Sequence, residues 1–147
     1  MQARNILEAK GSDVVTVTPE ARVGDVARLF KENRIGFALV HKAEGNGLVG
    51  TISERDIIHG LAATNGAVAE QPISTVLTAN IVTCDPETSV ESMMETMTEK
   101  RTRHLIVMDG NELMGIISIG DLIKSQISLY RNEAENMREY VNGVGYH

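Results

Sequence analysis

An internal repeat is the feature of this sequence that most restricts how the chain can fold. The segment VVTVTPEARVGDVARLFKENRIGFALV, which begins at Val14, aligns with IVTCDPETSVESMMETMTEKRTRHLIV, which begins at Ile81. After a turn that is two residues shorter in the second copy, LVGTISERDII (48–58) aligns with LMGIISIGDLI (113–123). A chain with such a repeat is expected to form two similar units rather than one irregular fold.

Each copy predicts the element order β-α-β-β-α. A short β-branched run is followed by Pro, which ends the strand in a turn, and then by apolar residues at helical spacing. Two apolar runs joined by a turn and a final helix complete the copy. The predicted fold class is α/β (α+β), with two tandem repeats packed into one pseudo-two-fold module, because about fifty residues bury little surface alone. The expected parts are an N-terminal helix in 1–13, repeats at 14–65 and 81–127, a linker at 66–80 and a helical tail at 128–147.

The composition limits the possible classes of function. The net charge of the 147 residues is −6 and aromatics make up 3%, and such a chain lacks the basic face that nucleic-acid phosphates require. The single Cys84 excludes an internal disulfide and fits a reducing cytosol, and the four His show no metal-ligand spacing. No apolar run is long enough to span a membrane and no signal peptide is visible. We therefore expect a cytoplasmic protein with no metal, nucleic-acid or membrane partner.

Several apolar helix faces predict self-association. The expected first helices of the two copies carry Val23/Val26/Phe30 and Val90/Met93/Met97, and the tail carries the stripe Ile127/Tyr130/Ala134/Met137. One small module is not expected to bury all of these, and exposed apolar patches mark interfaces. The sequence therefore predicts a homodimer, the commonest two-fold assembly.

The segment Ser118-Ile119-Gly120-Asp121 is the first candidate for binding chemistry. It lies where a strand is expected to end and a helix to begin, and Gly120 allows a ligand to approach the backbone closely. The first N–H groups of a helix favour anions, and an ionised Asp can accept hydrogen bonds from both hydroxyls of a ribose. Ser-x-x-Asp is also a capping box, and the two interpretations can hold together. Ser53 and Asp56 form the matching pair in the first copy.

A cationic run, Arg101-Thr102-Arg103-His104, is the second candidate. Arg presents a planar fork of donors that suits phosphate, and His can donate as well, so Arg103 and His104 are candidate phosphate ligands. The alternative is a solvated turn at a helix C-terminus, where cations are favoured. The first copy has Arg34-Ile35-Gly36-Phe37 here, so only the second copy is cationic throughout.

No catalytic motif occurs in the sequence. We find no nucleophile–base pair at recognisable spacing, no G-x-S-x-G, no H-E-x-x-H and no phosphate-binding G-x-x-x-x-G-K-[ST]. Cys84 falls in a strand and is expected to be an inert thiol. A binding module explains these residues better than an enzyme does.

The pattern of the two copies resembles the CBS domain, named after cystathionine beta-synthase. The resemblance rests on Pro after a short strand, an amphipathic helix, an apolar strand and then Gly-hydrophobic-hydrophobic-Ser-x-x-Asp, and it covers roughly 14–127. The stretches ISERDII, RTRHLIV and ISIGDLIK look like bacterial stand-alone CBS-pair proteins. The resemblance implies a dimer of disc shape and a cleft between the two sheets that binds AMP, ADP, ATP, NAD(H) or S-adenosylmethionine. One departure is Ile106, where the family often has Pro and where this chain therefore has a backbone N–H.

The resemblance places the ribose-binding carboxylate at Asp121, with Asp56 as its counterpart. Further residues have both a binding and a purely structural explanation. Arg55, Lys124 and Lys10 could reach a phosphate or lie in solvent at helix ends. Val15 and Val82 could contact adenine or belong to the core. Gly36 could keep the cleft open or form a turn, and Phe37 could stack on a base or fill the core. The complete predicted set is Asp121, Ser118, Gly120, Arg103, His104, Val15, Gly36, Phe37, Asp56, Ser53, Arg55, Val82, Lys10 and Lys124.

The function expected from the sequence is regulatory binding of an adenine nucleotide, with no catalysis. AMP is the first choice, because one Asp and a small cationic cluster suit a mononucleotide, and NAD(H) is the next. Binding is expected to shift the conformation of the dimer and to signal to an effector protein that the sequence does not identify. The alternative is a structural or interaction dimer that binds no physiological nucleotide.

Overall fold

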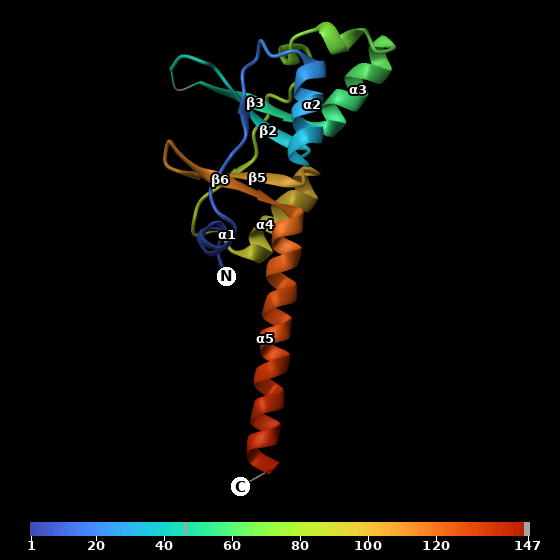
Figure 1. Ribbon diagram of the computed structural model, residues 1–147. Helices are drawn as coiled ribbons and strands as arrows, with labels where there is room; N and C mark the ends of the chain where they lie inside the picture. The colour runs from blue at the N-terminus through green and yellow to red at the C-terminus, as the bar shows by residue number, and fades with distance from the viewer. Residues whose placement is uncertain (46, 146–147) are drawn as a thin grey trace. The chain divides into compact units, whose positions relative to one another are not determined.

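The computed structural model describes residues 1–45 and 47–145, with side chains to residue 142, and it divides into two compact units (Figure 1). Asp13–Ile81 form the first-repeat unit. Met1–Ser12 and Val82–His147 form the second-repeat unit, so the two ends of the chain belong to the same unit.

The first-repeat unit follows the predicted order of elements. It contains β1 (Thr16–Val17), α2 (Val23–Asn33), β2 (Phe37–His41), β3 (Leu48–Ser53) and α3 (Glu54–Thr64). Its sheet has the order β1-β2-β3, with β1 parallel to β2 and β2 antiparallel to β3. Two short 3-10 turns, Ala67–Glu70 and Ile73–Thr75, follow α3.

The second-repeat unit repeats this arrangement and adds a helix at its start. It contains α1 (Ala3–Lys10), β4 (Thr83–Cys84), α4 (Val90–Lys100), β5 (His104–Asp109), β6 (Glu112–Ser118) and α5 (Ile119–Gly145). The sheet order β4-β5-β6 has the same parallel and antiparallel pairings. The predicted α/β fold class and the β-α-β-β-α order of each copy are therefore confirmed.

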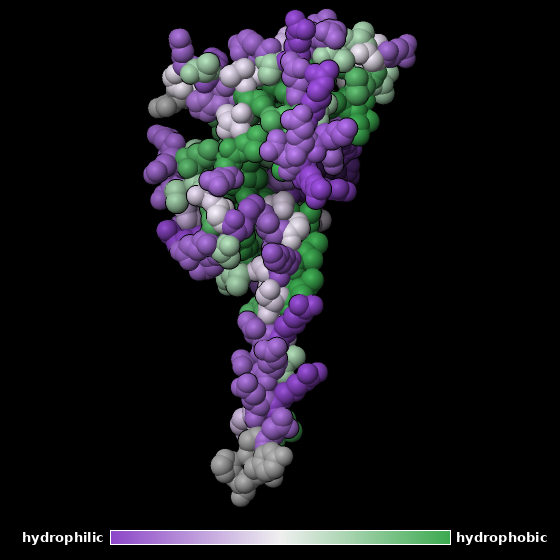
Figure 2. Space-filling view, viewed as in Figure 1, coloured by the Kyte–Doolittle hydropathy of each residue, from purple (hydrophilic) through white to green (hydrophobic). Residues whose placement is uncertain are grey.

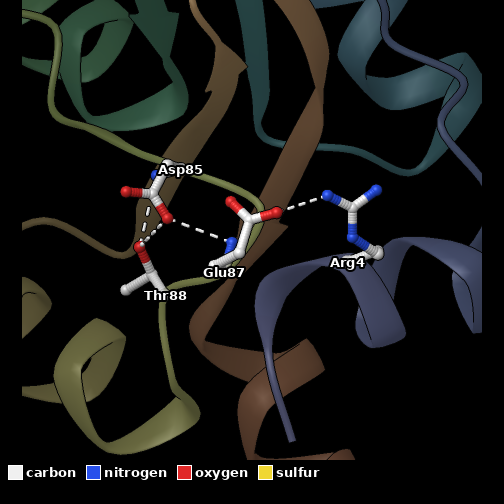
Figure 3. Close-up of polar contacts among 4 residues, drawn as sticks. All are labelled: Arg4, Asp85, Glu87 and Thr88. Atoms are coloured by element: carbon white, nitrogen blue, oxygen red, sulfur yellow. Dashed lines mark hydrogen bonds and ion pairs between the residues drawn. The ribbon is translucent and has the colours of Figure 1, made fainter.

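Helix α1 packs on the second repeat although about seventy residues separate them in the chain. Ala3, Ile6 and Leu7 are buried in the same core as Met93 and Leu105. The N–H of Ala3 donates to the Thr88 carbonyl over 2.9 Å, and the side chain of Arg4 forms an ion pair with Glu87 (Figure 3).

The turn that receives α1 is itself held by a local hydrogen-bond network (Figure 3). A carboxylate oxygen of Asp85 accepts from the Glu87 N–H over 3.0 Å and from the Thr88 hydroxyl over 3.1 Å. Such an Asx turn fixes the backbone just before α4. The turn therefore presents the Thr88 carbonyl and the Glu87 carboxylate to α1.

The segment after α3 packs in turn on the first repeat. Val68 and Ile73 are buried in the core that contains Val26 and Ile52. Thr51 and Thr78 exchange two backbone hydrogen bonds of 2.8 and 2.9 Å, which add an edge pairing beside β3. This approach is so close that a Cβ atom on Gly50 would lie 2.2 Å from the Thr78 carbonyl oxygen.

The apolar faces of α2 and α4 are not interfaces. Val23, Val26 and Phe30 are at most 5% exposed, and Val90, Met93 and Met97 at most 4%, because each helix covers the sheet of its own unit. The expectation that these faces remain available for dimerisation is wrong, since the sheet of each unit and the other helices packed on it bury them. The tail differs, because every described side chain of α5 from Ile127 to Asn142 is exposed.

Helix α5 projects beyond the core of its own unit (Figure 1). In the view of Figure 2 this part of the helix is largely hydrophilic, with apolar groups along one side. No helix in the described ranges has the length and apolar character needed to cross a membrane.

Candidate functional site

A polar cluster in the second-repeat unit surrounds the start of α5. Ser118 ends β6, and its hydroxyl accepts from the Asp121 N–H over 3.2 Å. Asp121 returns the interaction, because its Oδ2 atom accepts from the Ser118 N–H over 2.8 Å. Ser118 and Asp121 therefore form a reciprocal cap, as the structural interpretation of Ser-x-x-Asp predicts.

Lys10 binds the same carboxylate from the end of α1. Its Nζ atom lies 2.7 Å from Asp121 Oδ2 and 2.8 Å from the Ile116 carbonyl oxygen. Partial burial acts to raise the pKa of Asp121, but Lys10 and the hydrogen bonds from Ser118 hold it below its ordinary value. The side chain of Asp121 is 22% exposed, so an ionised carboxylate is held near the surface at a helix N-terminus.

Arg103 and His104 lie beside this cap. His104 pairs with Ser118 in the β5–β6 register, and the Arg103 carbonyl accepts from the Ile119 N–H over 2.8 Å. The pKa of His104 is lowered to about 4 by burial of the ring and by the charges of Lys10 and Arg103, against the opposing effect of Asp121. The ring is therefore neutral near pH 7, and at that pH it could offer a phosphate one N–H donor but no charge.

The lowered pKa of His104 predicts a specific pH dependence of stability. Well above pH ~6.5 the ring is neutral in both the folded and the unfolded chain, so its contribution to the free energy of unfolding is constant. As the pH falls toward about 4, only the unfolded chain takes up the proton, and stability should fall by on the order of 1–2 kcal/mol after allowance for partial exposure. Urea unfolding of wild type and His104→Gln between pH 4 and 8 would measure this difference. Parallel curves for the two proteins would contradict the assignment.

The first-repeat unit contains a related but less cationic cluster. Asp56 Oδ2 accepts from the Ser53 N–H over 2.9 Å, and Asp56 Oδ1 accepts from the Thr78 hydroxyl over 3.1 Å. The Gly36 carbonyl accepts from the Glu54 N–H over 2.9 Å, as Arg103 does from Ile119 in the other unit. A side chain at Gly36 would meet the Glu54 carboxylate, whose carbon lies 2.8 Å from the position of a Cβ atom.

The carbonyls of Val15 and Val82 take part in the sheets. They accept from the N–H groups of Leu39 and Ile106, each over 3.0 Å. The N–H that Ile106 adds to the family pattern is thus used within the second-repeat unit. Both valines are half-buried and pack against their cores, as their structural interpretation predicts.

The remaining predicted residues lie near the caps with different degrees of exposure. Phe37 is half-buried and pairs with Ser53 in the β2–β3 register. Arg55 and Gly120 are exposed in the first turns of α3 and α5, and Lys124 is exposed in the second turn of α5. The structure thus brings Lys10, Arg103, His104, Ser118 and Asp121 together in one unit, and it brings Ser53, Asp56, Gly36 and Phe37 together in the other.

Sequence reasoning missed two residues of the first cluster. Thr78 precedes the second copy in the same way that Lys10-Gly11 precede the first, so an extension of the repeat by a few residues would have found it. Glu54 became relevant only with its position against Gly36. Thr78 lies outside the Ser-x-x-Asp pattern that directed the prediction, and Glu54 occupies one of its unspecified positions.

The described residues contain no group of three His, Cys, Asp or Glu arranged to hold a metal ion. Burial raises the pKa of the Cys84 thiol to about 11, and Asp85 acts in the same direction. The thiolate is therefore scarce near neutral pH and Cys84 is a weak nucleophile, as expected.

Two β-α-β-β-α units, each with Ser-x-x-Asp at the start of its last helix, define a tandem module of CBS type. The family model of the CBS domain matches the chain twice, over residues 8–63 and 73–128. The chain therefore belongs to the CBS domain family and contains two such domains.

Two solved structures and one further relative agree with this assignment. A CBS-domain containing protein from Agrobacterium tumefaciens is 36% identical, with a TM-score of 0.82 over 85% of this chain and 92% of that chain. The CBS domain-containing protein YhcV of Bacillus subtilis is 30% identical and aligns over 84% of this chain and 86% of its own length. A CBS domain protein from Pyrobaculum aerophilum, solved in complex with AMP, shares the fold with a TM-score of 0.70 and 24% identity over 82% of this chain and 89% of that chain.

Proposed function

We propose that this chain is a regulatory module that binds an adenine nucleotide, with AMP as the first choice and NAD(H) as the next. One observation carries the proposal: the partly buried Asp121 carboxylate lies at a helix N-terminus, with the Lys10 ammonium 2.7 Å away, His104 at the start of the neighbouring strand β5 and Arg103 directly before it. A carboxylate flanked by cations has the chemistry to bind a ribose and a phosphate together.

The hydroxyls of the ribose are assigned to Asp121. An ionised carboxylate only accepts hydrogen bonds, and the cap and Lys10 both use Oδ2, so the cap does not require Oδ1. Binding would let Lys10 exchange its contact with Asp121 for one with the phosphate. Capping and ribose binding are therefore compatible roles of one side chain.

The second-repeat cluster suits a phosphate better than the first-repeat cluster does. At the two related positions it has Arg103 and Ile119, whereas the first repeat has Gly36 and the carboxylate of Glu54. A carboxylate at this position would repel a phosphate, and an Arg would attract it. We therefore assign the nucleotide phosphate to the second-repeat unit.

The comparisons support the ligand class without fixing the ligand. The protein from Pyrobaculum aerophilum has this fold and was solved in complex with AMP, which makes AMP the first ligand to test. NAD(H) follows, because Asp56 offers a second carboxylate in a related cap. No catalytic role is proposed for any residue of either cluster.

The output of the module is proposed to be a change in a homodimer that an effector protein reads. Ile58 is 61% exposed on α3 and lines a surface hollow of about 550 Å³ together with Phe30, Ile35 and Ile57. A surface hollow lined by several apolar residues suits self-association. A nucleotide shifts such an assembly only if it binds one conformation better than another, with coupling of about 1–3 kcal/mol being typical.

Thermal denaturation with AMP, ADP, ATP, NADH and S-adenosylmethionine tests the proposal directly. A ligand at a hundredfold excess over its Kd should stabilise the protein by about 2.7 kcal/mol, and AMP is expected to give the largest shift. No shift with any of the five would contradict nucleotide binding. That result would favour the alternative, a structural or interaction dimer.

Arg103→Ala should separate the phosphate from the nucleoside. We expect the affinity for AMP to fall by about tenfold or more and the affinity for adenosine to change little, because only AMP carries the charge that Arg recognises. Titration calorimetry of both ligands against wild type and variant measures the two effects. Equal losses would mean that Arg103 has a structural role instead.

A further inference from the structure

The projecting part of α5 carries an apolar seam with a heptad period. Apolar residues recur at alternating intervals of four and three residues, at Ile123, Ile127, Tyr130, Ala134, Met137 and Val141. These six positions correspond to the a and d sites of three heptads, the repeat typical of a coiled coil. Ile127, Tyr130, Met137 and Val141 are 46–66% exposed, so nothing in their own unit covers this seam.

The exposed part of the helix is difficult to sustain alone. From Ile127 to Gly145 it extends for about 28 Å at 1.5 Å per residue. Helices of this length are marginal in water, and in proteins most of their stability comes from packing an apolar face. The seam therefore requires a partner surface with the same period.

The charges beside the seam identify that partner as a second copy of α5 in parallel orientation. With Ile127, Ala134 and Val141 at a, the e positions are Lys124, Arg131 and Arg138, and the g positions are Gln126, Glu133 and Tyr140. In a parallel pair each g residue faces the e residue five positions later on the partner, so Glu133 meets Arg138. In an antiparallel pair the e edges face each other, and three cations would oppose three cations.

The residues at the a positions agree with this choice. Ile127 and Val141 are β-branched, and β-branched residues at a favour parallel two-stranded coiled coils. We propose that α5 pairs with α5 of a second copy as a parallel coiled coil, with Glu133 and Arg138 forming reciprocal ion pairs across the seam. The proposal rests on the homodimer proposed above and is independent of nucleotide binding.

Cysteine cross-linking of the full chain tests the pairing. In a Cys84→Ser background, Met137→Cys at a d position should form disulfide-linked dimers at least about tenfold faster than Asn132→Cys at the outward f position. Light scattering reports the mass in parallel. A monomer mass would overturn both the homodimer and the coiled coil. A dimer mass with equal cross-linking at 132 and 137 would overturn the coiled coil alone.

Charge reversal tests the orientation. Arg138→Glu should slow cross-linking at position 137 in a parallel pair, because it places two acids opposite each other, and adding Glu133→Arg should restore it. In an antiparallel pair Arg138→Glu would instead relieve repulsion and strengthen dimerisation, which would overturn the parallel assignment. Glu139→Lys, at an outward f position, is the matched control and should leave the rate unchanged.

Discussion

Asp121→Asn is expected to weaken AMP binding by at least about tenfold while the protein remains folded. An amide has one neutral acceptor oxygen, whereas the carboxylate accepts charge-assisted hydrogen bonds at both oxygens. The cap should survive because the Ser118 hydroxyl accepts from the backbone N–H of residue 121, which Asn keeps, and the amide oxygen still accepts from the Ser118 N–H. Calorimetric titration of AMP, with a thermal unfolding curve of the same variant, separates loss of binding from loss of structure.

Asp56→Asn provides the matched control for this prediction. Asp56 forms the same type of cap, but its neighbours are Thr78 and the acidic Glu54 rather than a cluster of cations. We expect it to change AMP affinity much less than Asp121→Asn does. Unchanged affinity in a folded Asp121→Asn protein would remove Asp121 from the site.

Gly50→Ala is expected to lower the free energy of unfolding by about 2–4 kcal/mol. The added Cβ atom would lie 2.2 Å from the Thr78 carbonyl oxygen, a backbone atom that can move only if both hydrogen bonds to Thr51 lengthen or break. The same movement would withdraw the Thr78 hydroxyl from Asp56. Urea unfolding of the two proteins measures the loss.

Gly120→Ala is the control for the general effect of replacing Gly. A Cβ atom there meets only the Ser118 hydroxyl oxygen, at 3.6 Å, and Gly120 is in a helix, where Ala is favoured by about 0.5–1 kcal/mol. Its stability should therefore stay level or rise. Similar losses in the two variants would show that the contact between Gly50 and Thr78 does not limit stability.

The sequence predicted the elements of each repeat because their signals are local. Pro after a short strand, helical spacing in α2 and α4, and Ser-x-x-Asp before the last helix each depend on neighbouring residues only. The location of the apolar helix faces was predicted wrongly. Their burial depends on how the helices of one unit pack on its sheet. Val26 and Met93 could serve an interface or a core equally well by sequence, and the structure places both in cores.

The candidate site also has a part that local sequence patterns predict and a part that depends on contacts between distant residues. The caps at Ser53/Asp56 and Ser118/Asp121 followed from spacing of three residues, and the structure contains both. The pairing of Lys10 with Asp121 joins residues far apart in the chain, so the sequence could nominate both and could not connect them. The neutral state of His104 depends on burial beside two cations, which no local pattern encodes.

The docking of α1 on the second repeat makes the order of folding unequal for the two halves. The first-repeat unit is one uninterrupted segment of the chain, so it can form all its contacts once residues up to Ile81 have emerged from the ribosome. The second-repeat unit is interrupted by the entire first repeat, so residues 1–12 must wait for a partner that is synthesised much later. Closing that long loop carries an entropic cost, and it is smaller when the intervening residues have already folded and brought their ends together. A first repeat that folds early is thus expected to lower the entropic cost of docking α1 on the second repeat.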